Sequence, residues 1–475
     1  MPANHGTRLI DRNMTAKRQL RRILGLGFGL AFGFGTMIGV GILRLPGMVA
    51  AAAGDPVTII LCWCVGGVYA LMGAVSVSEL AALYPETGGL RVYPRHAFGE
   101  RAGFVVGWID WLAVLATTAY AAVSAADFAA RLWPVLAERE RAVALAVVAM
   151  FGTMHAIGLR MGRSITAVVS TTIGILFLAL IVGCFMATPL ASVAGSAVPK
   201  IHGQTHWVVA FLSIVPAMRA IVTAYDGWYA PVYTAEECVD ASRTLPRAII
   251  GVAAAVTCLY VAINAAFLRV LPVPVLATSA LPAADAARIV LPYGSETLMT
   301  ILSLLIMLSL VNGQAIMGPR ILLSLARDGW VPPKLAGIGM GGTPQPALAA
   351  TMIGAGLVIV TGTFDEIIAL FAVLIVLNYV AVFLSVFVLR YRLPNATRPF
   401  KAWGYPVTTA IVLVGSVGFL LAAIIEDWRS GVTAVVFLSL CIPAYRLAGK
   451  SRRALASKAV PDDPVATGCS EIGRQ

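Results

Sequence analysis

Long apolar segments recur along nearly the whole chain, and they constrain its fold more than any other feature. About twelve of them approach the ~20 residues that a helix needs to cross a bilayer. Within lipid, only helices and closed barrels satisfy all backbone hydrogen bonds. Charged residues make up only 12% of the chain, whereas soluble domains carry roughly 25%. The sequence therefore predicts an all-α integral membrane protein in a lipid bilayer and excludes a soluble domain.

The predicted spans share an apolar run bounded by polar or turn-forming residues. They cover approximately residues 23–50, 57–83, 102–131, 140–157, 165–187, 207–236, 245–268, 295–325, 346–361, 364–390, 406–424 and 430–447. We expect a membrane domain over 23–448, flanked by cytoplasmic tails over 1–22 and 449–475.

The net charge of +12 would suit a nucleic-acid-binding protein, but the distribution of the charge indicates a membrane topology instead. With both termini inside, only seven of the 35 lysines and arginines fall in outer loops, namely Arg131, Arg139, Arg141, Lys200, Arg269, Arg288 and Arg429. Such a skew follows the positive-inside rule. We therefore predict a multi-pass protein of the cell (inner or plasma) membrane with both termini cytoplasmic and no nucleic-acid partner.

Glycines interrupt the first predicted span near its centre. The run is Ile38, Gly39, Val40, Gly41 and Ile42, followed by Arg44 and Pro46. An interior glycine costs up to about 1 kcal/mol relative to alanine in a helix. Close helix packing would account for Gly39 but not for Gly41. We expect the helix to unwind here.

The sixth predicted span carries a similar interruption, formed by Ala224, Tyr225, Asp226, Gly227 and Trp228 and followed by Pro231. The two breaks occupy corresponding places in halves of opposite orientation, 23–187 and 207–390, ahead of two further helices over 406–447. This arrangement is typical of transporters built on inverted repeats, whose substrate lies at the breaks.

The two breaks offer complementary backbone groups. Unwinding near Gly39–Ile42 frees N–H groups at the start of the outer half-helix, where the helix dipole favours a carboxylate. Unwinding near Ala224–Gly227 frees carbonyls, which accept hydrogen bonds from an ammonium group. A zwitterionic amino acid suits both, so we predict that residues 38–42 and 224–228 bind the substrate.

Several motifs in order resemble those of the amino acid–polyamine–organocation (APC) permeases, in their bacterial and L-type branch. Beyond the two breaks they are Glu79-Leu80-Ala81 with Gly88-Gly89-Leu90, Glu236-Glu237, Leu245-Pro246-Arg247-Ala248, Val311-Asn312-Gly313 with Arg320 and Ala326-Arg327-Asp328-Gly329, and Arg398-Pro399-Phe400-Lys401 with Gly404-Tyr405-Pro406. The resemblance implies a twelve-helix, 5+5 inverted-repeat (LeuT-like) fold and amino acid transport.

The chain departs from the family pattern at three places. Ile173 stands where many members carry a fifth-span lysine, and Arg91 stands where the family has a tyrosine. The resemblance therefore leaves the coupling ion open between sodium near the first break, a proton on Asp226, and obligatory exchange. Residues 131–141 contain no cysteine, so no disulfide-linked heavy chain is expected.

Charged residues within spans are functional candidates, because each costs at least about 2.5 kcal/mol on insertion scales. Asp226 is predicted to hold the substrate's amine or to carry a proton; alternatively, it caps the inner half-helix. Arg44 resembles the outer-gate arginine of neurotransmitter:sodium symporters and would pair with Asp365 or Glu366; alternatively, it reaches the outer interface. Arg219 is assigned to the same outer gate.

Other polar residues receive more conservative interpretations. Asp110 is expected to be buried and hydrogen-bonded. Three acids near inner helix ends, Glu79, Glu236 and Glu237, are expected either to pair with Arg160 or Arg247 or to remain solvated. Hydroxyls of Ser303 or Ser309 are candidates for sodium ligands.

The predicted function is secondary active transport by alternating access. The predicted substrate is an amino acid, with cationic amino acids included, or a related amine. The alternatives are an obligatory amino acid/polyamine exchanger and a non-transporting sensor or channel. An enzyme is disfavoured because the chain has only five histidines and no convergent catalytic set. No metal site and no cofactor are predicted, since His202 and His206 lack companion ligands.

Overall fold

The computed structural model describes residues 20–39, 41–188, 220–291, 293–362 and 364–426, with isolated positions near 217 and between 432 and 443. The side chains of 159–160, 364–374 and 423 lie outside that description. Across these ranges the chain forms helices and turns, and its one β feature is an isolated bridge between Leu24 and Cys238. The predicted all-α class is confirmed.

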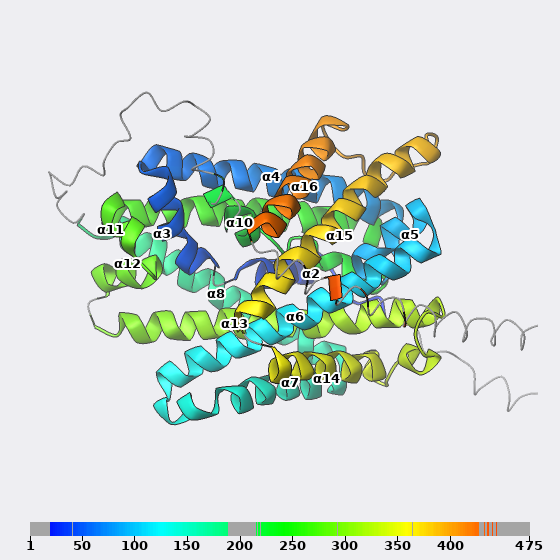
Figure 1. Cartoon of the computed structure of the whole chain (residues 1–475), viewed down its shortest axis with the longest axis horizontal. Helices are drawn as coiled ribbons and strands as arrows, with labels where there is room; N and C mark the ends of the chain where they lie inside the picture. Colours follow the sequence, from blue (N-terminus) through cyan, green and yellow to red (C-terminus); the bar gives the residue numbers. More distant parts are fainter. Residues whose placement is uncertain are drawn as a thin grey trace, which may run out of the picture.

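Long helices occupy the predicted spans that the structure describes (Figure 1). They are α2 (Leu26–Met37), α3 (Gly41–Ala53), α4 (Pro56–Leu83), α6 (Glu100–Leu132), α7 (Glu140–Ile157), α8 (Leu159–Met186), α10 (Ala241–Val270), α13 (Ser295–Arg327), α14 (Gln345–Thr361), α15 (Phe364–Arg392) and α16 (Val407–Glu426).

The number of spans is only partly established. Within the described ranges, seven helices are long and apolar enough to cross a membrane, and α2 with α3 forms an eighth if the bent pair is one span. Helices α14 and α16 are apolar but shorter. The predicted spans 207–236 and 430–447 lie partly or almost wholly outside the described residues, so the total of twelve stays a prediction.

Short helices fill segments between the predicted spans and, in the case of η3, the end of the predicted span 207–236. They are η1 (Gly89–Arg91), α5 (Val92–Phe98), η2 (Pro134–Arg139), η3 (Ala230–Glu237), α11 (Val273–Thr278), α12 (Pro282–Val290) and η4 (Pro333–Ala336). Helices α11 and α12 pack against α3. The approach is close, since a Cβ atom on Gly47 would lie 2.6 Å from the carbonyl oxygen of Ser279.

The interrupted first span lies inside the bundle, where α2 contacts α8, α10 and α13. Around it, α4 packs along α10 and α6 packs along α13, as Figure 1 shows. These pairs join the second members and the third members of the two predicted halves. Corresponding helices of the two predicted halves therefore pack in pairs.

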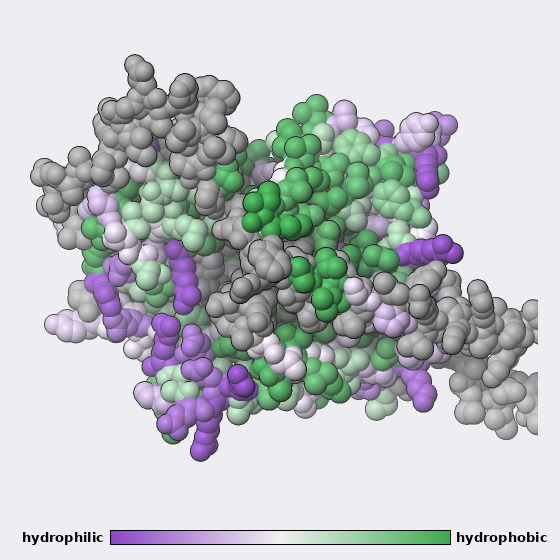
Figure 2. Space-filling view, in the orientation of Figure 1, coloured by the Kyte–Doolittle hydropathy of each residue, from purple (hydrophilic) through white to green (hydrophobic). Residues whose placement is uncertain are grey.

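Apolar side chains cover the middle of the molecule between two polar ends (Figure 2). Helix α8 illustrates this, because Val168, Ile175 and Leu178 are exposed by 59% or more. Exposed apolar surface on this scale indicates contact with something other than water. The arrangement fits a bilayer around the centre of the bundle.

Candidate functional site

The first span is broken where its glycines predicted. Helix α2 ends at Met37, α3 begins at Gly41, and the two are bent by 51°. The first N–H groups of α3 have no partner within the helix, and they carry the positive end of its dipole. The break thus presents hydrogen-bond donors suited to an anion. Val40 lies outside the described residues.

The sixth span also loses its helical form, as its sequence predicted. The helix stops at Ala224, residues 225–229 form a turn, and η3 follows from Ala230. Gly227 has φ of 104°, and a Cβ atom there would lie 2.7 Å from the carbonyl oxygen of Thr36. Only glycine fits both conditions. The two breaks consequently lie in direct contact.

Replacing Gly227 by alanine is expected to lower thermal stability clearly, because the new Cβ meets both a left-handed backbone and the Thr36 carbonyl. A non-glycine residue in such strain costs of order 1–3 kcal/mol. Gly54→Ala is the matched control, since Gly54 also has positive φ but has no neighbour within 4 Å. Equal melting temperatures of the two purified variants would contradict the close contact.

Hydroxyl groups tie the two breaks together. Thr36 Oγ1 lies 3.2 Å from the Gly227 carbonyl oxygen and 2.9 Å from the Phe32 carbonyl oxygen of its own helix, so these two acceptors share its proton. Tyr260 Oη lies 3.2 Å from both the Met37 and the Ala224 carbonyl oxygens. The carbonyls of the second break are thus partly engaged already, although each oxygen keeps a second lone pair.

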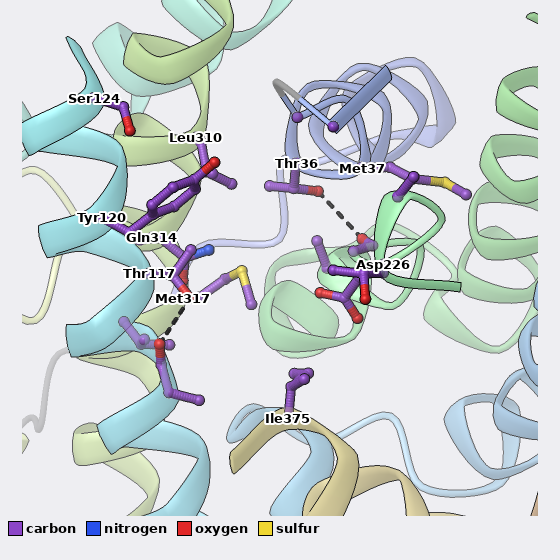
Figure 3. A pocket seen from close by; sticks show the side chains of 18 of the residues that line it. Thr36, Met37, Thr117, Tyr120, Ser124, Asp226, Leu310, Gln314, Met317 and Ile375 are labelled. Carbon is purple, nitrogen blue, oxygen red and sulfur yellow. Dashed lines mark hydrogen bonds between the residues drawn. The ribbon is translucent and has the colours of Figure 1, made fainter. Parts of the chain in front are cut away.

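A cavity of about 350 Å³ lies beside the breaks and is walled by α6, α13 and α15 (Figure 3). Five of the predicted binding residues line it, namely Gly39, Gly41, Ala224, Asp226 and Gly227. The other described ones do not: Ile38 and Ile42 are fully buried, Tyr225 packs against Trp63 and Tyr260, and Trp228 stacks on Tyr379.

The remaining walls come from residues that the sequence analysis did not select. Helix α6 contributes Asp110, Thr117, Tyr120, Ser124 and Asp127, helix α13 contributes Leu310, Gln314 and Met317, and α15 contributes Ile375. The α6 residues follow a helical spacing of three, four or seven. That polar stripe within an apolar span was a signal that could have identified this wall.

Asp226 reaches the cavity from the second break (Figure 3). Its carboxylate accepts hydrogen bonds from Tyr379 and, at 3.5 Å, from Tyr229. Within the described part of the chain no cation lies close enough to form an ion pair with it. Helix η3 begins at Ala230, and its N-cap residue Tyr229 makes no side-chain cap. The Asp226 carboxylate does accept a hydrogen bond from the Gly227 backbone, so its alternative role at the freed N–H groups stays open beside substrate binding.

Asp110 is buried and hydrogen-bonded, as expected. Its carboxylate accepts from Tyr233 Oη at 2.8 and 3.0 Å and from Asn378 Nδ2 at 3.2 Å. These bonds join α6, η3 and α15 at one end of the cavity. Both oxygens of this second acid therefore already have partners.

Arg44 and Asp127 mark the other end of the cavity, where both side chains are exposed. No ion pair of Arg44 occurs among residues whose side chains are described. Asp365 and Glu366 belong to the first turn of α15, but their side chains, like Arg219, lie outside the described residues. The predicted outer gate therefore stays a prediction.

Buried ion pairs close the end of the bundle beyond Asp110. Arg320 Nε and Nη2 bind the Glu237 carboxylate at 2.7 and 2.9 Å, with side-chain exposures of 2% and 0%. Glu79 pairs with Arg390 at 2.5 Å and Arg398 at 3.0 Å.

The predicted partners of the three acids were wrong. Glu236 pairs with Arg327 at 2.8 Å, and Arg247 provides none of the described contacts of the three acids. The side chain of Arg160 lies outside the described residues. Glu79 and Glu237 are also buried rather than solvated. The partners come from α13, from α15 and, with Arg398, from the segment after α15. Their distant positions in the chain gave no indication of this proximity.

Arg91, which replaces the family's tyrosine, is part of a second charged cluster. Its guanidinium is fully buried and binds Asp328 at 2.6 Å and the Gly103 carbonyl at 3.1 Å. Arg95 forms ion pairs with both Asp328 and Glu86. The pKa of the Glu86 carboxyl lies below its ordinary value because of its hydrogen bond with His96, assisted by the nearby Arg95.

A membrane bundle with a cavity between two broken helices, closed at one end by buried ion pairs, has the architecture of a transporter. Residues 29–442 match the family model described as "Amino acid permease". The chain belongs to this family, and the APC resemblance seen in its motifs is confirmed.

Characterised relatives are similar over most of the chain. The serine/threonine exchanger SteT of Bacillus subtilis is 26% identical over 444 residues, which cover 91% of this chain and 98% of that protein. The large neutral amino acids transporter small subunit 2 of Rattus norvegicus is 28% identical, covering 80% and 72%. The b(0,+)-type amino acid transporter 1 of Mus musculus is 26% identical, covering 86% and 84%.

Proposed function

We propose that the chain is a secondary active transporter that binds an amino acid or a related amine in the cavity between the breaks. The substrate carboxylate lies at the N-terminus of α3, where free N–H groups and the helix dipole stabilise an anion. The ammonium group lies at Asp226. The observation that carries this proposal is the partly buried Asp226 carboxylate, which faces the cavity without a cationic partner among the described residues.

Cationic amino acids are a second candidate substrate class for the same cavity. Asp226 and Asp110 both line the cavity, and the positively charged residue along its described lining, Arg44, lies at the exposed end. An excess of negative charge in a site of low dielectric favours positively charged groups. An amine without a carboxylate would use only the Asp226 half of the site.

Transport by alternating access follows from the two unequal ends of the cavity. Buried pairs such as Arg320 with Glu237 close the end that we assign to the cytoplasm, because lysines and arginines concentrate there. Arg44 with Asp365 or Glu366 closes the opposite end. We further propose a location in the cell membrane with cytoplasmic termini, and activity without a disulfide-linked heavy chain.

The outer gate is tested by exchanging its charges. Arg44→Glu and Asp365→Arg are each expected to reduce uptake several-fold, because each places like charges together at the closing interface. The double variant should recover most of the loss if the two side chains pair. Uptake by cells with matched surface expression is the measurement. Losses that simply add in the double variant would exclude the pair.

Flux into proteoliposomes tests the proposed function itself. Sodium, proton gradient and preloaded amino acid are varied separately, so that ion coupling and obligatory exchange give different results. Ser309 Oγ lies 3.3 Å from the Gly35 carbonyl, near the first break, whereas Ser303 bonds its own helix at Met299. A sodium requirement would favour the Ser309 region. The absence of flux for every amino acid under all conditions would refute amino acid transport.

A further inference from the structure

Gln314 is an unusual side chain within the cavity wall. It belongs to α13, lines the cavity and is 6% exposed. Figure 3 shows its amide directed from α13 toward the cavity. Among the described residues the amide has no hydrogen-bond partner. The amide therefore offers its donors and its acceptor to whatever fills the cavity.

Neighbouring polar groups do have partners. Asn312, two residues earlier on α13, accepts from His155 at 2.9 Å and donates to Thr166 at 2.7 Å. Thr117 on α6 donates to the Ala113 carbonyl at 2.8 Å. Most buried polar groups in proteins are satisfied in this way. Gln314 therefore differs from its surroundings, and its open donors and acceptor face the space that a substrate would fill.

The position of Gln314 relative to the breaks indicates which part of a substrate it meets. Thr36 and Asp226 lie on one side of the cavity, and Gln314 lies across it beside Thr117 and Met317 (Figure 3). If the charged groups of an amino acid are held at the breaks, which is the proposed function on which this step rests, its side chain extends toward α6 and α13.

We infer that Gln314 determines specificity by binding the uncharged, hydrogen-bonding side chain of the substrate, a hydroxyl or a carboxamide. A primary amide offers both donors and an acceptor, so it satisfies either group. An aliphatic side chain of equal size would leave the amide buried and unpaired. Thr117, Leu310 and Met317, which lie around it, carry no charge, and Asp110 is already engaged by Tyr233 and Asn378.

The test compares amino acids of nearly equal shape. Binding of threonine against valine, and of asparagine against leucine, is measured from the rise in melting temperature of the purified protein, which follows ligand affinity. The wild type should prefer the polar member of each pair by roughly tenfold or more, because a site built for hydrogen bonding rejects the analogue that lacks the group.

Gln314→Met removes the amide while keeping an unbranched side chain of similar size, and it should reduce both preferences to about threefold or less. Gln314→Asn keeps the amide and should retain the polar preference at lower affinity. If Gln314→Met does not fold, Gln314→Asn still tests the inference, because a loss of the polar preference in this variant would contradict it. Gln345→Met is the control, since this exposed α14 amide donates to the Ala156 carbonyl away from the cavity. It should bind like the wild type.

Three results would overturn the inference directly, and two further ones would also do so. The first three are an unchanged polar preference in Gln314→Met, a wild-type preference for valine and leucine, and a wild-type preference for lysine over all four. If no amino acid of any class stabilises the wild type, the proposed function fails and the specificity inference fails with it. If amino acids bind without discrimination within the pairs, only the role of Gln314 is refuted.

Discussion

Asp226→Asn is expected to reduce amino acid uptake by about tenfold to a hundredfold. The substitution preserves size but replaces one acceptor oxygen by a donor NH2 group, and it removes the negative charge that we assign to the substrate ammonium group. A hydrogen bond to a charged group contributes ~1.5–3 kcal/mol, and each 1.4 kcal/mol corresponds to about a tenfold change in affinity. Uptake is measured in proteoliposomes containing equal amounts of folded protein, over a range of pH.

The contacts of Asp226 provide controls for this prediction. Tyr379→Phe removes a hydroxyl that donates to the same carboxylate while leaving its charge, so it should reduce uptake much less than Asp226→Asn. Asp127→Asn alters an exposed acid at the opposite end of the cavity and should also have a small effect. Unchanged uptake and an unchanged pH profile in Asp226→Asn would exclude a role in charge recognition or proton transfer.

Glu237→Gln is expected to be among the most destabilising single substitutions in the chain. It leaves the Arg320 guanidinium buried without its bidentate carboxylate partner. Breaking a buried ion pair from one side costs about 3–5 kcal/mol. The measurement is the melting temperature of the detergent-purified protein, together with its yield in the membrane.

A double variant tests whether the loss of stability comes from the unpaired buried charge at this pair. Arg320→Met with Glu237→Met replaces both charges by apolar groups, which often restores the stability lost in single variants. Arg243→Gln is the control, because its pair with Asp240 is 3.8 Å long and 76% and 56% exposed, and such pairs contribute about 0–1 kcal/mol. A melting temperature of Glu237→Gln equal to that of Arg243→Gln would contradict the burial of the pair.

The fold was largely predictable because lipid imposes a simple requirement on the sequence. A spanning helix needs a long apolar run, and the helices that the structure describes begin and end close to those runs. Glycine in an apolar run likewise indicated both breaks. The positive φ of Gly227 and the interruption between Met37 and Gly41 follow from local chemistry, which a sequence displays directly.

The site was predictable only in part. Asp226 was identified because an acid within a span is costly. Trp228, by contrast, was included for its proximity in sequence, yet successive side chains of a turn point in different directions, and this one packs against Tyr379. Gln314 was missed because an uncharged polar residue in a span has many structural roles. The role that we propose for it depends on the absence of a hydrogen-bond partner among the described residues, which only the packed structure reveals.

Long-range partners were the least predictable feature. Arg320 lies 83 residues from Glu237 along the chain, and Arg390 lies 311 residues from Glu79. Several basic residues near the same end were equally plausible from sequence. Which of them meets an acid depends on how α13 and α15 are placed around η3 and α4, and this is a property of the assembled bundle.

The central claim is that one amino acid bridges the two breaks, with its carboxylate at α3 and its ammonium group at Asp226. The most direct measurement is competition binding to the purified protein by a transported amino acid, its methyl ester and its α-hydroxy acid analogue. The ester lacks the carboxylate charge and the hydroxy acid lacks the ammonium group. The account predicts that each analogue binds at least about tenfold more weakly, the equivalent of one charge-assisted hydrogen bond. Equal binding of either analogue would contradict it.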